Sequence, residues 1–303
     1  MSKIVGIGAN VFDTLYTVDN YPKEDTKMSA NAVKISGGGP CATGLVAASK
    51  LGASCAFIGN LSDDNGGKFL KADFEKYGVS TDLIKIKSGF ETFCSCIWLV
   101  KETTSRTCVF FKGNVPPTEI RDAEIDAIAN AKVLMVDGND MNAAIEGAKI
   151  AKDNGTKVLY DAGGLYEGVE NLLPYADILI PSEEFATGHT KTKTAEEAAK
   201  ILFEKYSPDI VVITQGKKGG IIFDGNSIKS YPAFLVDAVD SNGSGDVFHG
   251  AFAFAITQNM EYEKACVFSS AVSALKCTKI GAREGVPTFE DTINFLKERG
   301  VDV

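Results

Sequence analysis

Two patterns of apolar and polar positions alternate along most of the chain. After residue 120, short apolar runs typical of buried strands are separated by longer segments with apolar residues at helical spacing. The predicted strands cover residues 133–136, 158–160, 178–180, 210–214 and 221–223. The predicted helices cover residues 120–130, 143–154, 195–206, 247–257, 263–277 and 289–299. This alternation predicts an α/β fold, in which a doubly wound, mostly parallel sheet carries helices on both faces.

The N-terminal part adds two more strand patterns to the main sheet, at residues 3–8 and 57–59, and a helix at 67–77 that Gly78 ends. No linker or low-complexity tract interrupts the chain, so we expect one domain that spans residues 1–303.

A different pattern predicts a second, smaller β layer. Its strands are expected at residues 15–18, 32–35, 93–100 and 106–111, and the last two form an antiparallel hairpin. We interpret the segments at about 14–36 and 91–112 as a β-sheet lid over a pocket. The edge strands of such a lid can pair with a second copy, so a homodimer through the lid is expected.

Composition narrows the range of partners. The chain has 303 residues, a net charge of −9 and no cluster of Lys or Arg, so nucleic acid and anionic membranes are poor partners. It has no apolar run long enough to cross a membrane and starts directly with a strand pattern, so we expect a cytoplasmic protein. The seven cysteines lie mostly in apolar segments, as buried thiols do in a reducing compartment.

The most informative stretch is 239–250, which joins a strand-like run at 233–236 to the helix at 247–257. It contains Gly243, Ser244, Gly245 and Asp246 in succession. A glycine-rich turn before a helix leaves N–H groups free at the positive end of the helix dipole, where an anion binds. A carboxylate there can take a proton from an attacking hydroxyl, and we expect the dipole to lower the pKa of Asp246. Alternatively, Ser244 or Asp246 only caps the helix.

Two features near the N-terminus predict a ligand site. Asp13 follows the first strand, where open α/β sheets bind ligands, and its carboxylate can accept hydrogen bonds from a sugar diol. Three glycines at 37–39 let the backbone approach a ligand, and Pro40 suits the first position of a helix. A turn-capping aspartate and a simple tight turn are the alternatives. The Gly-x-Gly at 6–8 lacks the third glycine of a dinucleotide fingerprint.

In this order and spacing, the motifs resemble those of the ribokinase-like (PfkB) carbohydrate kinases along essentially the whole chain. One motif lies within residues 37–67, and the other runs from Asp240 to Gly250 and is similar to the family's Asp-Thr-x-Gly-Ala-Gly-Asp. Segments 274–278 and 281–287 look most like the branch that includes sulfofructose kinase and ketohexokinase-like enzymes. The resemblance implies a ribokinase-like fold with a lid.

The resemblance also implies roles for matching residues. Asp246 matches the catalytic base. The other matches are the anion hole (Gly243, Ser244, Gly245), the sugar site (Asp13, Gly38, Gly39), the nucleotide site (Thr214, Gly216, Gly219) and a loop that coordinates a monovalent cation in relatives (Asp240, Asn242, Gly281, Gly285).

Some positions depart from the family pattern. Thr43 stands where many relatives have a sugar-binding Asn. The Asn-x-x-Glu motif that helps to organise magnesium and phosphate reads Ser182-Glu183-Glu184-Phe185, so Ser182 with Glu183 or Glu184 has to replace it. Where an arginine for a sulfonate is expected, the chain has Asn139, which leaves Lys112 and Asn114 of the lid as further substrate-binding candidates.

The resemblance therefore implies an ATP-dependent sugar kinase that transfers the γ-phosphate to a primary hydroxyl of a small sugar, with a ketohexose or a derivative ranked first. ATP and Mg²⁺ are the implied cofactors, and K⁺ is a further one. A sulfofructose kinase, a nucleoside kinase and a sugar or nucleotide sensor without catalysis remain the alternatives.

Overall fold

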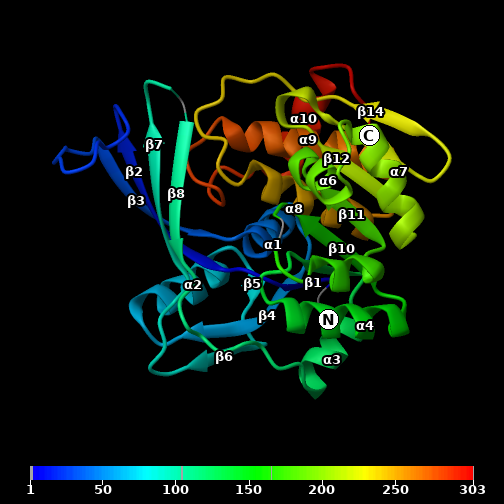
Figure 1. Ribbon diagram of the computed structural model, residues 1–303, viewed down its shortest axis with the longest axis horizontal. Helices are drawn as coiled ribbons and strands as arrows, with labels where there is room; N and C mark the ends of the chain where they lie inside the picture. The colour runs from blue at the N-terminus through cyan, green and yellow to red at the C-terminus, as the bar shows by residue number, and fades with distance from the viewer. Residues whose placement is uncertain (1–2, 104, 165, 303) are drawn as a thin grey trace.

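A computed structural model of the chain describes residues 3–103, 105–164 and 166–302, which form two β-sheets surrounded by helices (Figure 1). Positions 1–2, 104, 165 and 303 of the predicted domain and lid lie outside the described residues. None of the helices in the described ranges has the length and apolar character needed to cross a membrane.

The larger sheet follows the order β14-β13-β12-β11-β10-β9-β1-β4-β5, and β6 pairs with β4. Neighbouring strands are parallel from β12 to β5, whereas β13 and β14 add an antiparallel edge. The strands are β1 (Ile4–Ile7), β4 (Cys55–Ser62), β5 (Val79–Ser80), β6 (Ile84–Lys87), β9 (Val133–Val136), β10 (Lys157–Ala162), β11 (Ile178–Pro181), β12 (Ile210–Thr214), β13 (Gly220–Phe223) and β14 (Ile228–Tyr231). The predicted doubly wound, mostly parallel sheet is confirmed.

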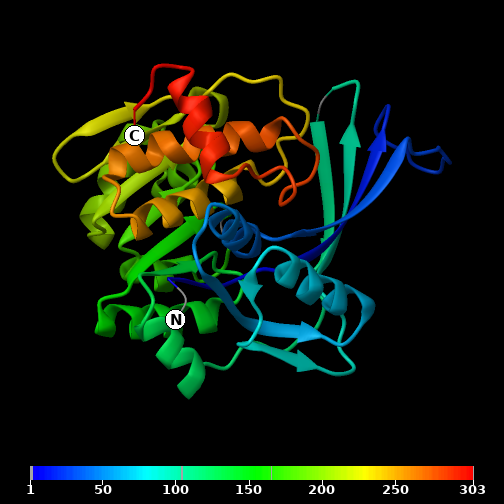
Figure 2. The same cartoon turned by 180° about the vertical axis from the view of Figure 1, so that it is seen from behind.

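Helices cover both faces of this sheet because its central strands are apolar on both sides. One face packs against α1 (Pro40–Lys50), α2 (Asn65–Lys76), α8 (Ser244–Thr257), α9 (Tyr262–Cys277) and α10 (Phe289–Lys297). The other face packs against α3 (Asp122–Ala129), α4 (Met141–Asn154), α5 (Val169–Leu172), α6 (Glu183–Thr190) and α7 (Ala195–Tyr206). Figure 2 shows α9 and α10, in orange and red, over the face that is turned away in Figure 1.

The smaller sheet has the order β3-β2-β7-β8 and stands beside the main sheet (Figure 1). Its strands are β2 (Val11–Val18), β3 (Ala32–Gly38), β7 (Cys94–Val100) and β8 (Ser105–Phe111). These strands confirm the predicted second β layer and its antiparallel hairpin. The edge strand β8 exposes Val109, Phe110 and Phe111. The homodimer through this sheet stays a prediction.

One predicted strand is wrong, and several elements were not predicted. Residues 233–236 form an irregular segment, because Phe234 and Val236 pack against the helical core and not into a sheet. The Phe234 ring lies 5.5 Å from that of Phe295 in α10, which accounts for the apolar positions there. The elements β5, β6, β14, α5 and α6 have no counterpart in the sequence analysis.

Close packing of α1 on α8 positions the N-terminus of α8. A Cβ atom added at Gly250 would lie 2.0 Å from the carbonyl oxygen of Gly44, whereas one added at Gly245 would meet no atom within 4 Å. We therefore expect Gly250→Ala to lower the free energy of unfolding by about 1–3 kcal/mol, because the two helices must separate. Gly245→Ala should change it by less than about 1 kcal/mol. Urea unfolding of both variants checks this, and equal stabilities would contradict it.

Candidate active site

The site lies where the strand order of the main sheet reverses. β1 is flanked by β4 on one side and by β9 on the other, so the connections leave the sheet in opposite directions and open a crevice at the carboxyl ends of the strands. Asn10 follows β1 and Asp137 follows β9 at this edge. Asp137 Oδ2 accepts hydrogen bonds from the N–H of Ala9 at 2.8 Å and of Cys41 at 3.0 Å. The carboxylate thus ties the loop after β1 to the start of α1.

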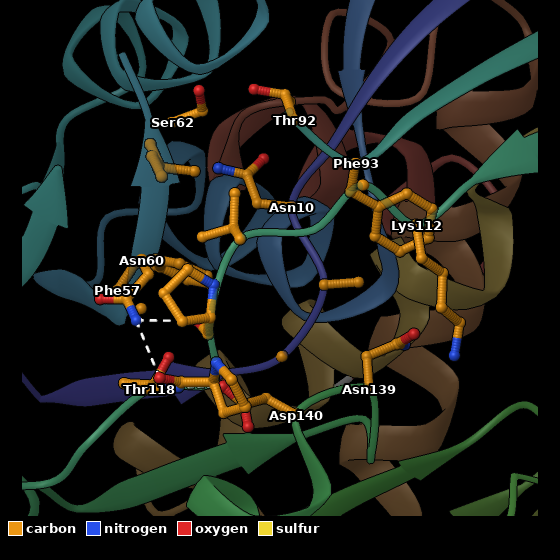
Figure 3. Close-up of a pocket in the computed structure, with 18 of the residues that line it drawn as sticks. Asn10, Phe57, Asn60, Ser62, Thr92, Phe93, Lys112, Thr118, Asn139 and Asp140 are labelled. Atoms are coloured by element: carbon orange, nitrogen blue, oxygen red, sulfur yellow. Dashed lines mark hydrogen bonds between the residues drawn. The ribbon is translucent and has the colours of Figure 1, made fainter. Parts of the chain in front are cut away.

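A cavity of about 380 Å³ opens at this crevice between the main sheet and the lid (Figure 3). Lys112 and Asn139 line the same side of it, and Asn10 and Phe93 also line it. Asn114 does not line it, because its Oδ1 atom accepts a hydrogen bond from the N–H of Glu91 at 2.7 Å. Two of the three candidates for recognition of a substituent on the sugar therefore face one cavity.

Beside this cavity, Asp13 packs directly against the glycine triplet. Its Oδ1 atom accepts a hydrogen bond of 2.6 Å from Ser95 Oγ. A Cβ atom at Gly38 would lie 1.9 Å from Asp13 Oδ2, and one at Gly39 would lie 2.4 Å from the carbonyl oxygen of Ala9. Glycine is required at both positions by close contact, and Gly39 also has a positive φ of 92°.

Arg283 ties the triplet to the C-terminal part of the chain. Its side chain is buried, and its Nη2 atom donates to the carbonyl oxygen of Gly38 at 2.6 Å and to Asn10 Oδ1 at 2.8 Å. Its Nη1 atom donates to Asp73 Oδ2 at 2.6 Å. One guanidinium group therefore holds α2, the loop after β1 and the triplet together.

The first turn of α8 presents free N–H groups. Gly243 caps the helix in the left-handed conformation with φ 72°, so no side chain satisfies the first amides. Among the described residues, no acceptor is in hydrogen-bonding geometry with the N–H of Gly245 or Asp246. Asp246 is half-buried and lies close enough to Asp13 for its charge to raise the pKa of Asp13. The N–H of Ser244, another predicted member of the anion hole, donates to the carbonyl oxygen of Ser241 at 3.2 Å, so the free amides of this turn are those of Gly245 and Asp246. The roles of the anion hole, the base and the sugar carboxylate stay predictions.

The expected direction of the Asp246 pKa is wrong. Burial raises the pKa of Asp246, and the nearby charges of His249 and Arg106 oppose that rise only in part. The helix dipole was expected to dominate, but loss of water around the carboxylate outweighs it. A raised pKa makes Asp246 a better proton acceptor than the sequence predicts.

The predicted nucleotide-site residues meet on two neighbouring strands. Ser182 after β11 pairs with Thr214 at the end of β12, and Ser182 Oγ caps α6 by accepting from the N–H of Phe185. Glu183 Oε1 accepts a hydrogen bond of 2.8 Å from Gln215 Nε2, whereas Glu184 is exposed. Gly216 and Gly219 in the following turn both have positive φ, at 57° and 87°. Glu183 is thus the glutamate that faces the predicted nucleotide site.

Comparison with known proteins identifies the family. The model of the pfkB family carbohydrate kinases matches residues 1–289. The chain belongs to the pfkB family of carbohydrate kinases. This kinase is 28% identical to ribokinase of Haemophilus influenzae over 297 residues, which are 96% of this chain and 97% of that protein. It is 25% identical to ketohexokinase of Mus musculus over 286 residues, which are 91% and 96% of the two chains.

A solved ribokinase structure has the same fold as this pfkB kinase. Ribokinase of Arabidopsis thaliana, in complex with ribose and ATP, superimposes with a TM-score of 0.87 at 24% identity and covers 98% of this chain and 99% of that one. The predicted ribokinase-like fold with a small β-sheet lid is confirmed.

Three polar residues of this kinase that contact α8 or the residue before its cap are absent from the sequence prediction. His249 is buried, and its Nδ1 atom lies 2.6 Å from the carbonyl oxygen of Gly245 and 3.2 Å from Asp161 Oδ2. Burial raises the pKa of Asp161 to about 7. Arg106 of the lid donates to Asn242 Oδ1 at 3.0 Å. Asp161, like Asp137, directly follows an apolar run of the main sheet, which is the signal that could have identified both carboxylates.

Thr43 of the kinase is fully buried in α1, and its hydroxyl has no hydrogen-bond partner among the described residues. The structure thus gives this side chain no exposed surface beside Asp13, and its role in sugar binding stays a prediction.

Proposed function

We propose that the kinase transfers the γ-phosphate of ATP to a primary hydroxyl of a ketohexose or a ketohexose derivative. The observation that carries the proposal is the first turn of α8, where the Asp246 carboxylate belongs to the turn with the free N–H groups of Gly245 and Asp246 and lies within electrostatic reach of Asp13. An acceptor hydroxyl held by Asp13 and the Gly38–Gly39 backbone would face a base and an anion site together.

In this mechanism, Asp246 accepts the proton of the hydroxyl as its oxygen bonds to the γ-phosphorus, while the bond from that phosphorus to the bridging oxygen breaks and ADP leaves. The N–H groups of Gly245 and Asp246, which have no acceptor among the described residues, would stabilise the charge on the transferring group, aided by the positive end of the α8 dipole. Bound ATP with Mg²⁺ would supply the electrophilic phosphorus. Thr214, Gly216, Gly219 and Ser182 would bind the nucleotide, and Glu183 would orient the waters of Mg²⁺, which binds proteins through few carboxylates.

Two observations bear on the sugar. Ketohexokinase of Mus musculus, a relative over most of both chains, supports a ketohexose. Lys112 and Asn139 on one side of the cavity favour sulfofructose as a second candidate, because an ammonium and an amide can bind a sulfonate. A nucleoside is ranked lower, since Phe12 and Phe93 already contact the rings of Phe69 and Phe110.

The test is ADP release from Mg²⁺–ATP with ketoses, aldoses, sulfofructose and adenosine as acceptors, together with melting of the protein in each ligand. The proposal predicts ADP release with a ketohexose that Asp246→Asn abolishes. Release only with adenosine would establish a nucleoside kinase. Melting shifts without release from any acceptor would establish a sensor.

Asp13 makes sugar binding dependent on pH. Burial raises the pKa of Asp13 from 3.8 to about 6, with the Ser95 hydroxyl and Arg283 opposing the rise. Sugar binding needs the ionised carboxylate as acceptor, so KM for the sugar should rise about tenfold from pH 8 to pH 5. In Asp13→Asn, KM should be higher at every pH and independent of pH over this range. Initial rates at several pH values check this, and a flat wild-type profile would contradict it.

A further inference from the structure

Lysine ammonium groups contact both segments that, by the family resemblance, would bind a monovalent cation. Lys276, near the end of α9, has no exposed surface. Its Nζ atom donates to the carbonyl oxygen of Asp240 at 2.8 Å and to that of Asn242. The same nitrogen lies 3.8 Å from Asp240 Oδ2. Two carbonyl groups and one carboxylate of the first segment therefore surround a single ammonium group.

Two further lysines contact the second segment, the loop 281–285, and the residue before it. Lys50 Nζ donates to the carbonyl oxygens of Arg283 at 3.3 Å and Glu284 at 3.1 Å. Lys34 Nζ donates to the carbonyl oxygen of Ile280 at 3.1 Å and forms an ion pair with the Glu284 carboxylate. Carbonyl oxygens in both segments therefore already accept hydrogen bonds from lysine ammonium groups.

An ammonium group and K⁺ interact with such oxygens in similar ways. Each carries one positive charge and is satisfied by several oxygen atoms, and the three N–H bonds of a lysine can be directed at different acceptors. Burial lowers the pKa of Lys276, whereas the Asp240 carboxylate acts in the opposite direction. A K⁺ ion bound between Asp240 and Asn242 would have to displace the buried Lys276 side chain. These residues therefore do not fit K⁺.

The contact of Lys276 with residues 240–242 bears on the proposed active site because this segment leads directly into α8. Asn242 is followed directly by Gly243, which caps α8. Asp240 also fixes the segment from its side chain, since Oδ1 accepts from the N–H of Asn242 at 2.8 Å and Oδ2 from the N–H of Gly281 at 2.9 Å. Lys276 thus holds the main chain immediately before the N–H groups of the anion site.

We propose that the Lys276 ammonium group takes the place of the monovalent cation, so that the anion-binding turn before Asp246 is ordered without K⁺. The consequence for turnover rests on the proposed kinase function. The consequence for cation binding does not, because it can be measured on the protein without substrates.

The experiment compares KCl with tetramethylammonium chloride at equal ionic strength. Melting temperature is measured without substrates. ADP release is measured with the acceptor sugar that the test of the proposed function identifies. The proteins are the wild type, Lys276→Ala and the control Lys279→Ala, which removes an exposed lysine three residues away. In Lys276→Ala, the carbonyl groups of Asp240 and Asn242 lose their cation, and the truncated side chain leaves room for an ion.

We expect the wild type and Lys279→Ala to give the same melting temperature and turnover in both salts. Lys276→Ala should melt at a lower temperature and lose at least about tenfold in turnover in tetramethylammonium, and KCl should restore part of both. Loss of packing alone would not produce a response specific to K⁺. A K⁺-specific response of the wild type would overturn the proposal even if Lys276→Ala failed to fold. A folded Lys276→Ala variant whose melting temperature and turnover were the same in KCl and tetramethylammonium chloride would overturn it as well. Melting shifts without ADP release from any protein would contradict the kinase function alone.

Discussion

Asp246→Asn is expected to lower turnover by a factor of about a hundred or more while sugar binding is nearly unchanged. General-base contributions lie at about 10²–10⁴-fold, and the asparagine keeps the shape of the side chain but cannot accept the proton. The raised pKa of Asp246 supports this role, because a carboxylate that has lost part of its surrounding water gains more from protonation than one in bulk water. Steady-state ADP release measures the effect on turnover, and calorimetry measures the effect on sugar binding.

The control for this variant is Asp291→Asn. Asp291 occupies the third position of α10, as Asp246 does in α8, and there it takes part in a capping box with Thr288. This control removes a first-turn carboxylate of the same kind from a helix outside the site, so its turnover should equal that of the wild type. Turnover of Asp246→Asn within about threefold of the wild type would remove Asp246 from the role of base.

Arg283→Met is expected to have the largest effect on stability. The substitution leaves the buried Asp73 carboxylate without its cation, and the carbonyl group of Gly38 and the amide oxygen of Asn10 lose their donor. Breaking a buried ion pair by removing one partner costs about 3–5 kcal/mol, so the free energy of unfolding should fall by that amount. Sugar KM should also rise, because Arg283 holds the glycine triplet against Asp13. Urea unfolding and initial rates measure the two effects.

Two further variants test whether the stability lost in Arg283→Met comes from the unpaired Asp73 carboxylate and not from the loss of an arginine as such. Arg121→Met removes an exposed arginine that pairs with Glu119, and it should leave stability almost unchanged. Asp73→Asn combined with Arg283→Met removes the unpaired charge, so part of the lost stability should return. If Arg283→Met were as stable as Arg121→Met, the network around Gly38 would not be what holds the triplet in place.

The sequence determined the fold class because each central strand and helix carries its own periodicity. The apolar run at 133–136 and the helical spacing at 195–206 are local patterns, and both elements have these bounds in the structure. The motif of Asp246 was also readable, since the glycines, the serine and the carboxylate are adjacent in the chain. The predicted strand at 233–236 is wrong because its apolar residues pack against the helical core and not into a sheet. The pattern of apolar positions in one segment does not show which element those residues pack against.

The tertiary structure alone decided which distant residues complete the site and how they are charged. Arg283 meets Gly38, Asn10 and Asp73 across more than two hundred positions of sequence, and Lys276 reaches the carbonyl groups before Gly243 from another helix. The pKa of Asp246 rises because water is excluded by elements that converge only in the fold, whereas the sequence shows only its place at a helix N-terminus. Hydrogen bonds and desolvation depend on distance in space, and local sequence patterns carry no information about that distance.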